Sequence, residues 1–264
     1  MPDKRPMKII LSPAKKMETH LDLLPYKEFP EFLSETEVLM NWIKALSYPE
    51  AKALWACNDK LADLNFQRFR GMDLRKNLTP ALISYEGIQY QYMAPRVFSE
   101  KELEYVQEHV RILSGFYGIL RPLDGVTPYR LEMQAKWQLL ENKLNPSQEK
   151  DHCCSSLYDF WGQKLYQALS DPDRTILNLA SKEYSKAVEA YLQPEDLFIT
   201  FVFGEWKNGK VIQKGTQAKM ARGEMVRYLA ECQIEEPQAA KNFSRLGYRF
   251  QEKLSSPEKY VFLK

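Results

Sequence analysis

Ionisable side chains and backbone-stiffening residues occur together in one stretch of the chain, Arg111 to Trp137. An apolar run there gives way to a segment punctuated by Gly115, Gly118, Pro122, Gly125 and Pro128, which carries Arg121, Asp124, Tyr129, Arg130 and Glu132. Prolines fix their own φ and push the preceding residue towards an extended conformation, whereas glycines permit close approach of another backbone or a ligand. Ionisable groups on constrained backbone after a buried strand are typical of a functional edge. We therefore expect a stiff functional loop here.

Basic and amide side chains also follow other expected strands. Together with those of the stiff loop they are Lys15, Lys16, Arg121, Arg130, Asn178, Lys182, Lys219 and Arg222. Open sheets bind ligands at strand ends, where loops and helix N-termini converge. Because arginine and lysine both suit phosphates, these residues predict a positively charged phosphate-binding cleft. The alternative is that each is a solvated surface charge, paired locally with Glu132, Glu183 or Glu224.

Acid–base chemistry at the same loops is a second hypothesis. An enzyme acting on a nucleotide or nucleobase would use Lys182 or Glu132 as acid or base, with arginines on the phosphate. Lys182 would need burial for this role, which the sequence does not reveal. The chain contains no GxSxG nucleophile elbow, no P-loop and no GxGxxG fingerprint, so those enzyme classes are not indicated.

Aromatic residues lie near two of these loops: Tyr85, Tyr90, Tyr92, Phe116, Tyr117 and Tyr129. Aromatic rings beside basic groups suit stacking with unpaired bases. Aromatic side chains also dominate core burial, and the sequence favours that interpretation for most of them.

The composition is that of an ordinary globular protein. The 264 residues are 44% hydrophobic and 27% charged, with a net charge of +2, which neither requires nor excludes nucleic acid as a partner. No apolar run approaches the roughly 20 residues that span a bilayer. The N-terminal residues lack a secretory h-region and cleavage site, so we expect a cytoplasmic protein.

The cysteines and histidines predict no metal site and no cofactor. Cys57, Cys153, Cys154 and Cys232 form no CxxC pair, and the three histidines show no HExxH spacing. His152 beside Cys153 and Cys154 could suggest a metal shell, but ligands must converge in space and neighbouring residues rarely do so. A segment leading into a helix is the favoured interpretation.

Strands and helices alternate for much of the chain. Strands are expected at 8–11, 81–85, 112–113 and 175–179, and helices within 32–69, at 99–109, 156–169, 180–192 and 217–232. Ser99 with Glu102 predicts a capping box, and Asn208-Gly209 predicts a β-hairpin that breaks strict βαβ order. We therefore predict an α+β fold, a mixed sheet with packed helices, as a single domain over residues 1–264.

Six stretches of the chain resemble the YaaA family. They are ILSPAKKM (10–17), PALISYEGIQYQYM (80–93), ILSGFYGILRPLDGVTPYRLEM (112–133), LYDFWG (157–162), NLASKEYSKAV (178–188) and AKMARGEM (218–225). The resemblance runs over essentially the whole chain. It implies a cytoplasmic protein of the peroxide-stress response that helps to limit free intracellular iron and binds DNA through a positively charged cleft.

The resemblance also implies a helix-hairpin-helix-like element, which maps onto Asn58 to Arg70. Its polar positions are Lys60, Asp63, Asn65 and Arg68. Asp63 stands where the family pattern has a glycine whose amide approaches a phosphate, so we expect a weakened contact there. Met220 stands beside Lys219 where the family commonly has a second lysine.

The leading hypothesis is a DNA-binding stress protein that contacts duplex or damaged DNA chiefly through phosphates, as a monomer, with an indirect effect on iron. The alternative is an enzyme that acts on a nucleotide or nucleobase in the same cleft. Convergence of the basic side chains within one cleft is the observation that both hypotheses need.

Overall fold

Strand β1 (Lys8–Leu11) lies inside the main sheet because its apolar side chains are covered on both faces. Ile9, Ile10 and Leu11 have no exposed surface, which is typical of a central parallel strand. The structure is a computed structural model, and it describes residues 7–135, 155–170 and 174–264. Lys136, Trp137, His152, Cys153 and Cys154 lie outside the described residues, so the end of the expected stiff loop and the expected helix-entry segment are not described.

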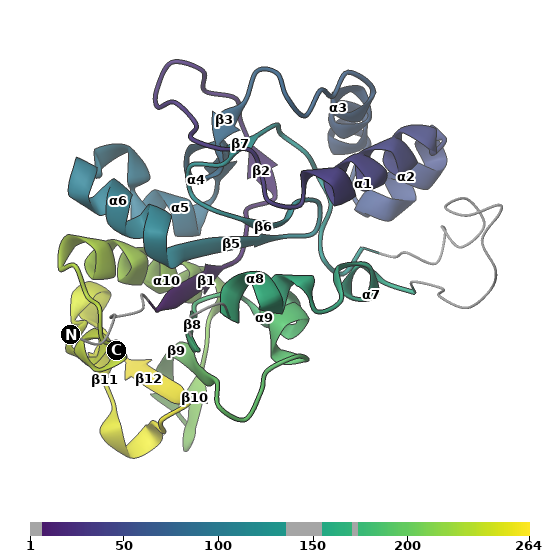
Figure 1. The fold of residues 1–264 in the computed structure, drawn as a ribbon. Helices are drawn as coiled ribbons and strands as arrows, with labels where there is room; N and C mark the ends of the chain where they lie inside the picture. The colour runs from purple at the N-terminus through teal and green to yellow at the C-terminus, as the bar shows by residue number, and fades with distance from the viewer. Residues whose placement is uncertain (1–6, 136–154, 171–173) are drawn as a thin grey trace.

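The main sheet is mixed and has eight strands (Figure 1). Strands β5 (Val110–Ser114) and β8 (Thr175–Asn178) pair with β1 in parallel, and β9 (Leu197–Lys207) and β12 (Lys259–Leu263) continue the parallel sheet beyond β8. Strands β6 (Gly118–Leu120) and β11 (Arg249–Phe250) pair antiparallel at the edges, and β10 (Lys210–Ile212) forms a hairpin with β9. The predicted mixed α/β architecture is confirmed.

The order of the strands reverses beside β1. The chain passes from β1 to β5 and β6 on one side, then returns to β8 on the other side and continues to β9. In open sheets of this kind, ligands bind outside the carboxyl ends of the strands at such a switch point. A ligand site is therefore expected at the carboxyl ends of β1 and β8.

Helices cover the sheet in groups (Figure 1). Helices α6 (Glu100–His109) and α10 (Gly215–Glu231) pack together with α5 (Ile88–Met93), and α8 (Lys164–Ser170) packs with α9 (Lys182–Glu189). Helices α1 (Leu33–Ala45), α2 (Tyr48–Trp55) and α3 (Asp59–Arg70) form a third group. Two short ladders, β2 (Lys16–Met17) with β4 (Tyr85–Glu86) and β3 (Thr79–Pro80) with β7 (Gly125–Val126), lie outside the main sheet. None of the helices in the described ranges has the length and apolarity needed to cross a membrane.

Local sequence signals located several elements correctly. Ser99 and Glu102 form the predicted capping box, in which the Ser99 amide donates to Glu102 Oε2 at 2.6 Å. The predicted hairpin turn at Asn208-Gly209 has positive φ at both positions, 53° and 73°, as a two-residue type I′ turn requires.

The strand predicted at 81–85 is wrong. Residues Ala81–Ser84 form the short helix α4, and only Tyr85 and Glu86 are extended. Hydrogen bonds with distant backbone fix the start of this helix, since the Ala81 amide donates to the Asp124 carbonyl at 2.9 Å. A short apolar run that is buried on all sides has no periodicity that separates helix from strand.

The hairpin element expected within Asn58–Arg70 is also placed differently. Residues Asp59–Arg70 are one continuous helix, capped by the Asn58 side chain, which accepts from the Leu61 amide at 3.0 Å. The turn between two helices lies earlier, between α2 and α3, where Ala56 has a φ of 44°. Asp63 therefore lies in mid-helix and not in a hairpin turn.

Two further helices differ in their bounds from the prediction. The helix predicted at 156–169 is broken at Gly162 into α7 (Leu157–Trp161) and α8. Helix α10 begins at Gly215, two residues before the predicted start at 217, and its first turn has no side-chain cap.

Helices α5 and α10 approach so closely that only glycine fits at one contact. A Cβ built on Gly223 would lie 2.0 Å from the Gln89 carbonyl oxygen and 2.9 Å from the Met93 amide nitrogen. Both neighbours are backbone atoms, which cannot rotate away as a side chain can. The absence of a side chain at Gly223 thus sets the distance between two helices that line the candidate site.

We predict that Gly223→Ala destabilises the protein by about 1–3 kcal/mol or more, because α5 and α10 must separate. Gly215→Ala is the matched control on the same helix, since a Cβ there meets nothing within 4 Å. That control is expected to be neutral or stabilising, by up to about 1 kcal/mol. Urea unfolding of the two variants checks this, and equal stabilities would contradict the close-contact argument.

Candidate functional site

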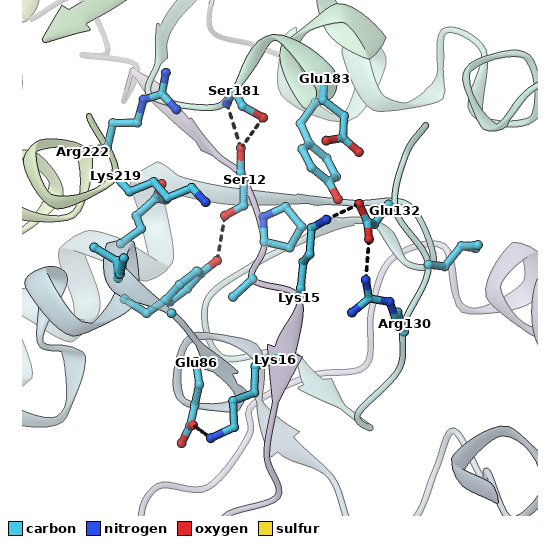
Figure 2. A pocket seen from close by; sticks show the side chains of 18 of the residues that line it. Ser12, Lys15, Lys16, Glu86, Arg130, Glu132, Ser181, Glu183, Lys219 and Arg222 are labelled. Carbon is cyan, nitrogen blue, oxygen red and sulfur yellow. Dashed lines mark hydrogen bonds and ion pairs between the residues drawn. The ribbon is translucent and has the colours of Figure 1, made fainter. Parts of the chain in front are cut away.

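A cavity of about 400 Å³ lies at the switch point of the sheet (Figure 2). Segment 12–16, which follows β1, and Ser181, which follows β8, both line it. The other walls come from β4 and α5, from residues 129–132, and from α9 and α10. Its charged lining residues are Lys15, Lys16, Arg130, Lys219 and Arg222, together with Glu86, Glu132 and Glu183. The cations outnumber the carboxylates.

Hydrogen bonds fix the backbone at the end of β1. The Ser181 amide donates to Ser12 Oγ at 2.8 Å, and the two serine hydroxyls lie 3.1 Å apart. The Tyr90 hydroxyl donates to the Ser12 carbonyl at 3.0 Å. These bonds link β1, β8 and α5, so the lysines that follow Ser12 start from a rigid base.

The segment that carries Arg130 and Glu132 lies against the end of β5. A Cβ on Gly115 would meet the Leu131 carbonyl oxygen at 2.6 Å, so glycine is what permits this contact. The Gly115 carbonyl in turn accepts from Trp161 Nε1 at 3.1 Å. The expected stiffness of this stretch thus has a direct cause, because Gly115 at the end of β5 contacts residues 131–133 and is itself held by Trp161 of α7.

Three of the five cations in the cavity form ion pairs with carboxylates. Glu132 accepts from Lys15 at 2.7 Å through Oε2 and from Arg130 at 2.9 Å through Oε1. Lys16 lies 2.6 Å from Glu86. Lys219 and Arg222 have no carboxylate partner among the residues that the structure describes. Local pairing, the alternative considered from the sequence, therefore accounts for only part of the charge.

Three side chains that line the cavity also contain buried nitrogen atoms that have no hydrogen-bond partner among the described residues. They are Gln89 Nε2, Arg130 Nε and Arg222 Nε. Burial lowers the pKa of Arg222 from its ordinary value, since the guanidinium is shielded from water and has gained no anion. Buried donors of this kind cost free energy unless an acceptor arrives. The arrangement favours an anion in the cavity.

The two carboxylates at the other side of the cavity have different surroundings. Burial raises the pKa of Glu183, the charge of Glu132 raises it further, and a backbone hydrogen bond from the Gln134 amide at 3.3 Å opposes both. Glu132 instead holds two cations. Paired carboxyl groups in unlike environments are a common basis for division into acid and base.

Three of the sequence-predicted residues lie outside this cavity. Arg121 pairs with Glu28 at 3.1 Å and lines a separate hollow. Lys182 is 77% exposed, pairs with Glu189 and lines a third hollow. Asn178 is buried and accepts from the Ala180 amide at 3.0 Å. The cavity thus contains fewer of the basic residues than the single cleft expected from the sequence. The exposed Lys182 also lacks the burial that a catalytic lysine would need.

The polar positions of the expected helix-hairpin-helix element are mostly engaged within the fold. Asp63 accepts from the Tyr48 hydroxyl, Asn65 is buried and donates to the Leu61 carbonyl at 2.7 Å, and Arg68 donates to the Met17 carbonyl at 3.0 Å. Lys60 is exposed on α3. These residues support α3 and its contact with β2 and offer no turn to a phosphate.

The aromatic residues near the loops mostly fill the core. Tyr85, Tyr90, Phe116, Tyr117 and Tyr129 are all at most 5% exposed, so these five do not form a stacking surface for bases. The Tyr129 hydroxyl bonds Ser114 Oγ at 2.6 Å and Tyr85 at 2.8 Å.

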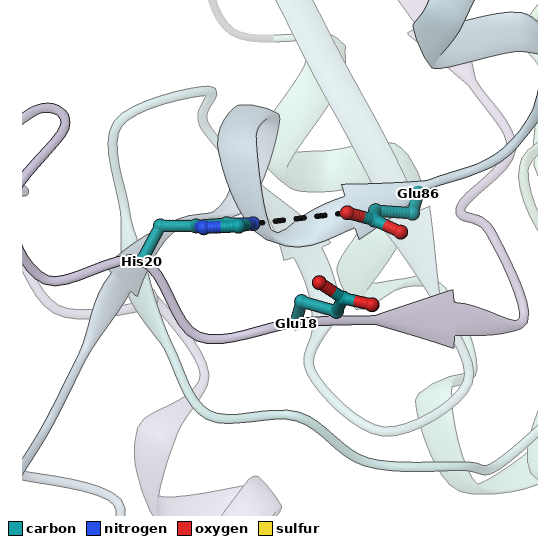
Figure 3. Close-up of side chains that lie close together, drawn as sticks. All are labelled: Glu18, His20 and Glu86. Carbon is teal, nitrogen blue, oxygen red and sulfur yellow. Dashed lines mark ion pairs between the residues drawn. The ribbon is translucent and has the colours of Figure 1, made fainter.

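One group among the described residues could hold a metal ion (Figure 3), and one of its members, Glu86, also lines the cavity. Glu18, His20 and Glu86 each offer a ligand atom within 4.8 Å of the others. Two cations already occupy this group, because Lys16 lies 2.6 Å from both glutamates and Arg96 lies 3.0 Å from His20 Nε2. The bond from Lys16 holds the pKa of Glu18 below its usual value.

The sequence pattern missed several residues of the cavity. Gln89, Ser12, Ser181 and Glu183 carry no recognisable motif by themselves. Gln89 does fall within the family-like stretch 80–93, and Ser181 and Glu183 fall within 178–188, so the motifs contained a signal that residue type alone did not.

A buried carboxyl group lies in the hollow that contains Arg121. Burial raises the pKa of Asp124 to about 7, opposed by the amide and charge of Arg121. The side chain is 2% exposed. Within the part of the chain that the structure describes, Oδ1 has no hydrogen-bond partner, whereas Oδ2 accepts from the Arg121 amide at 2.8 Å.

We predict that Asp124 makes the protein less stable as the pH rises from about 4 to about 7. An unfolded aspartate has a pKa of about 3.9, so within this window the folded state binds the extra proton and loses stability as it is removed. Asp124→Asn removes this slope and gains roughly 2–4 kcal/mol relative to the wild type at neutral pH. Urea unfolding across pH, with exposed Asp22→Asn as control, measures the difference; parallel profiles would contradict the prediction.

The chain is similar to a known protein family and to several of its members. A family profile described as peroxide stress protein YaaA matches residues 7–254. A UPF0246 protein of Agathobacter rectalis is 54% identical over 256 residues, which cover 97% of this chain and 98% of the relative. One from Lachnoclostridium phytofermentans is 55% identical over 258 residues, with 98% and 96% covered. One from Pediococcus pentosaceus is 50% identical, with 98% of each chain covered.

The family match extends through every wall of the cavity, from the loop after β1 to helix α10. The resemblance inferred from the sequence motifs is confirmed over nearly the whole chain. The protein belongs to the peroxide stress protein YaaA family, UPF0246.

Proposed function

We propose that the protein binds DNA by taking a nucleotide phosphate into the switch-point cavity, as part of the peroxide-stress response. The observation that carries this proposal is the set of donors without acceptors. Lys219 and Arg222 lack carboxylate partners in the described ranges, and buried nitrogens of Gln89 and Arg130 are unpaired in the same lining. A phosphate oxygen would satisfy several of them at once.

The size and shape of the cavity favour an exposed nucleotide over smooth duplex. About 400 Å³ suits a nucleotide-sized group, whereas a duplex presents its phosphates along a broad surface. We therefore favour DNA ends, unpaired positions and damaged sites as ligands. The expectation from the sequence was duplex or damaged DNA, and the proposal adds DNA ends and unpaired positions. It omits a contact through the hairpin element, because Asp63 and Asn65 form hydrogen bonds within the fold.

The rest of the proposal extends the expectations drawn from the sequence. The protein acts in the cytoplasm as a monomer and protects DNA directly, and its effect on free iron is indirect. The Glu18–His20–Glu86 group does not alter this view, because Lys16 and Arg96 already neutralise it.

An enzyme acting on a nucleotide or nucleobase is the second candidate function. The specific observation in its favour is that Glu132 and Glu183 line the same cavity in unlike surroundings. Glu132 was already a candidate acid or base from the sequence. Glu183 replaces Lys182 as the second candidate, because it lines the cavity and Lys182 does not.

We predict that Arg222→Gln weakens binding of a 5′-phosphorylated single-stranded oligonucleotide by roughly tenfold or more, because a charge-assisted bond contributes about 1.5–3 kcal/mol. Log affinity should fall linearly with log salt. The slope should shrink by about 0.7 for each phosphate that is no longer neutralised in Arg222→Gln or Lys219→Ala. Fluorescence anisotropy across a salt series measures both quantities.

The charge-matched control is Lys207→Ala on the β9–β10 hairpin, which should bind as the wild type does. Lys182→Ala and Arg121→Ala distinguish the wide cleft expected from the sequence from the cavity, since only the wide cleft requires them. Absence of wild-type binding at low salt, or an equal loss in the control, would refute the proposed function.

A further inference from the structure

We propose that the cavity hydrolyses the N-glycosidic bond of a nucleoside 5′-phosphate unit, with Glu183 as general acid and Glu132 as the residue that positions the attacking water. The inference rests on the proposed function, because it takes the phosphate to bind beside Lys219 and Arg222. It goes beyond that function by naming a bond and a chemical role for each carboxyl group.

The charges of the cavity are divided between two sides. Figure 2 shows Lys219 and Arg222 on one side of the Ser12 segment, and Glu132 and Glu183 on the other. In a nucleoside 5′-phosphate, the sugar separates the phosphate from the glycosidic carbon. A phosphate held by the free cations therefore directs the glycosidic bond towards the carboxyl groups.

Glu132 is positioned to orient water. Its two oxygens accept separately, Oε1 from Arg130 at 2.9 Å and Oε2 from Lys15 at 2.7 Å, so the carboxylate cannot rotate freely. A carboxylate has about four acceptor positions, which leaves room for a water hydrogen on either oxygen. The Gly115 contact with the Leu131 carbonyl fixes the backbone next to it.

Glu183 is suited to donate a proton. It follows Ser181 and Lys182 at the start of α9, and its backbone carbonyl accepts from the Tyr158 hydroxyl at 2.8 Å. Burial and the neighbouring charge of Glu132 raise its pKa. A carboxyl group of raised pKa that shares a cavity with an ion-paired carboxylate is the arrangement that glycoside cleavage uses.

The reaction balances without a further reactant besides water. The water oxygen bonds to the anomeric carbon as the carbon–nitrogen bond breaks, and the electron pair of that bond goes to the leaving base. Glu183 gives its proton to the base nitrogen, and Glu132 receives a proton from the water. The products are a free base and a sugar phosphate, and proton transfer through solvent restores both carboxyl groups.

The same nucleotide unit could come from two sources, a free nucleotide or an unpaired position in DNA. The wild-type protein is incubated with the four 2′-deoxynucleoside 5′-monophosphates, with the matching nucleosides, and with 5′-phosphorylated single-stranded oligonucleotides, one of which carries an oxidised guanine. Chromatography measures released base, and an aldehyde-reactive probe measures abasic sites in the DNA. The arm that yields base identifies the source.

The variants Glu183→Gln and Glu132→Gln keep the shape of the side chains, and thermal unfolding checks that each variant is folded. Each is expected to lower base release by about 100-fold, the usual size of an acid–base contribution. Phosphate-ligand affinity should stay within about twofold in Glu183→Gln and should not weaken in Glu132→Gln, because that change frees Lys15 and Arg130 from their ion pairs. Wild-type turnover should fall as the pH rises through the raised pKa of Glu183, because the acid must be protonated. Glu189→Gln, on the same helix but outside the cavity, should retain full activity.

Base release that these two variants lose and the Glu189 variant retains supports the inference. Binding of the phosphorylated probes without base release from any of them overturns it and leaves the proposed function standing. Absence of binding overturns both. Equal losses in the Glu189 and Glu183 variants would also overturn the assigned roles.

Discussion

Parallel pairing of β1 with β5 on one side and β8 on the other is the constraint on which the rest of the structure depends. Parallel strands end at the same edge, so the loops after β1 and β8 must meet there. The hydrogen bond between the Ser181 amide and Ser12 Oγ joins these two loops directly. Helix α5 is tied to the same junction, because the Tyr90 hydroxyl donates to the Ser12 carbonyl.

Much of the fold was predictable because its signals are local. The capping box at Ser99, the turn at Asn208-Gly209 and the apolar strands each depend on a few neighbouring residues. Residues 81–84 were not predictable in the same way, since the amides of Ala81 and Leu82 donate to the distant carbonyls of Asp124 and Pro122. Periodicity cannot report such bonds.

The sequence predicted which types of residue line the site, but only some of the individual residues. Lys15 and Arg130 share the cavity as the spacing after strands suggested, but Asn178, at an equally suggestive position, turns inward and bonds the next loop. Gln89 was missed because a neutral amide on a short helix carries no signal until Gly223 places it beside Arg222. Side-chain direction, which depends on packing, is the information that one sequence lacks.

The close contact of Gly223 with Gln89 has a consequence for how the protein folds. The wall made by residues 129–132 lies near β5 in sequence, whereas the wall shared by α5 and α10 joins segments far apart in the chain. Contacts between distant segments carry the larger loop-closure cost and tend to form late. The wall shared by α5 and α10 therefore carries the larger entropic cost of folding, and any ligand that binds only the completed cavity would stabilise the whole molecule against unfolding.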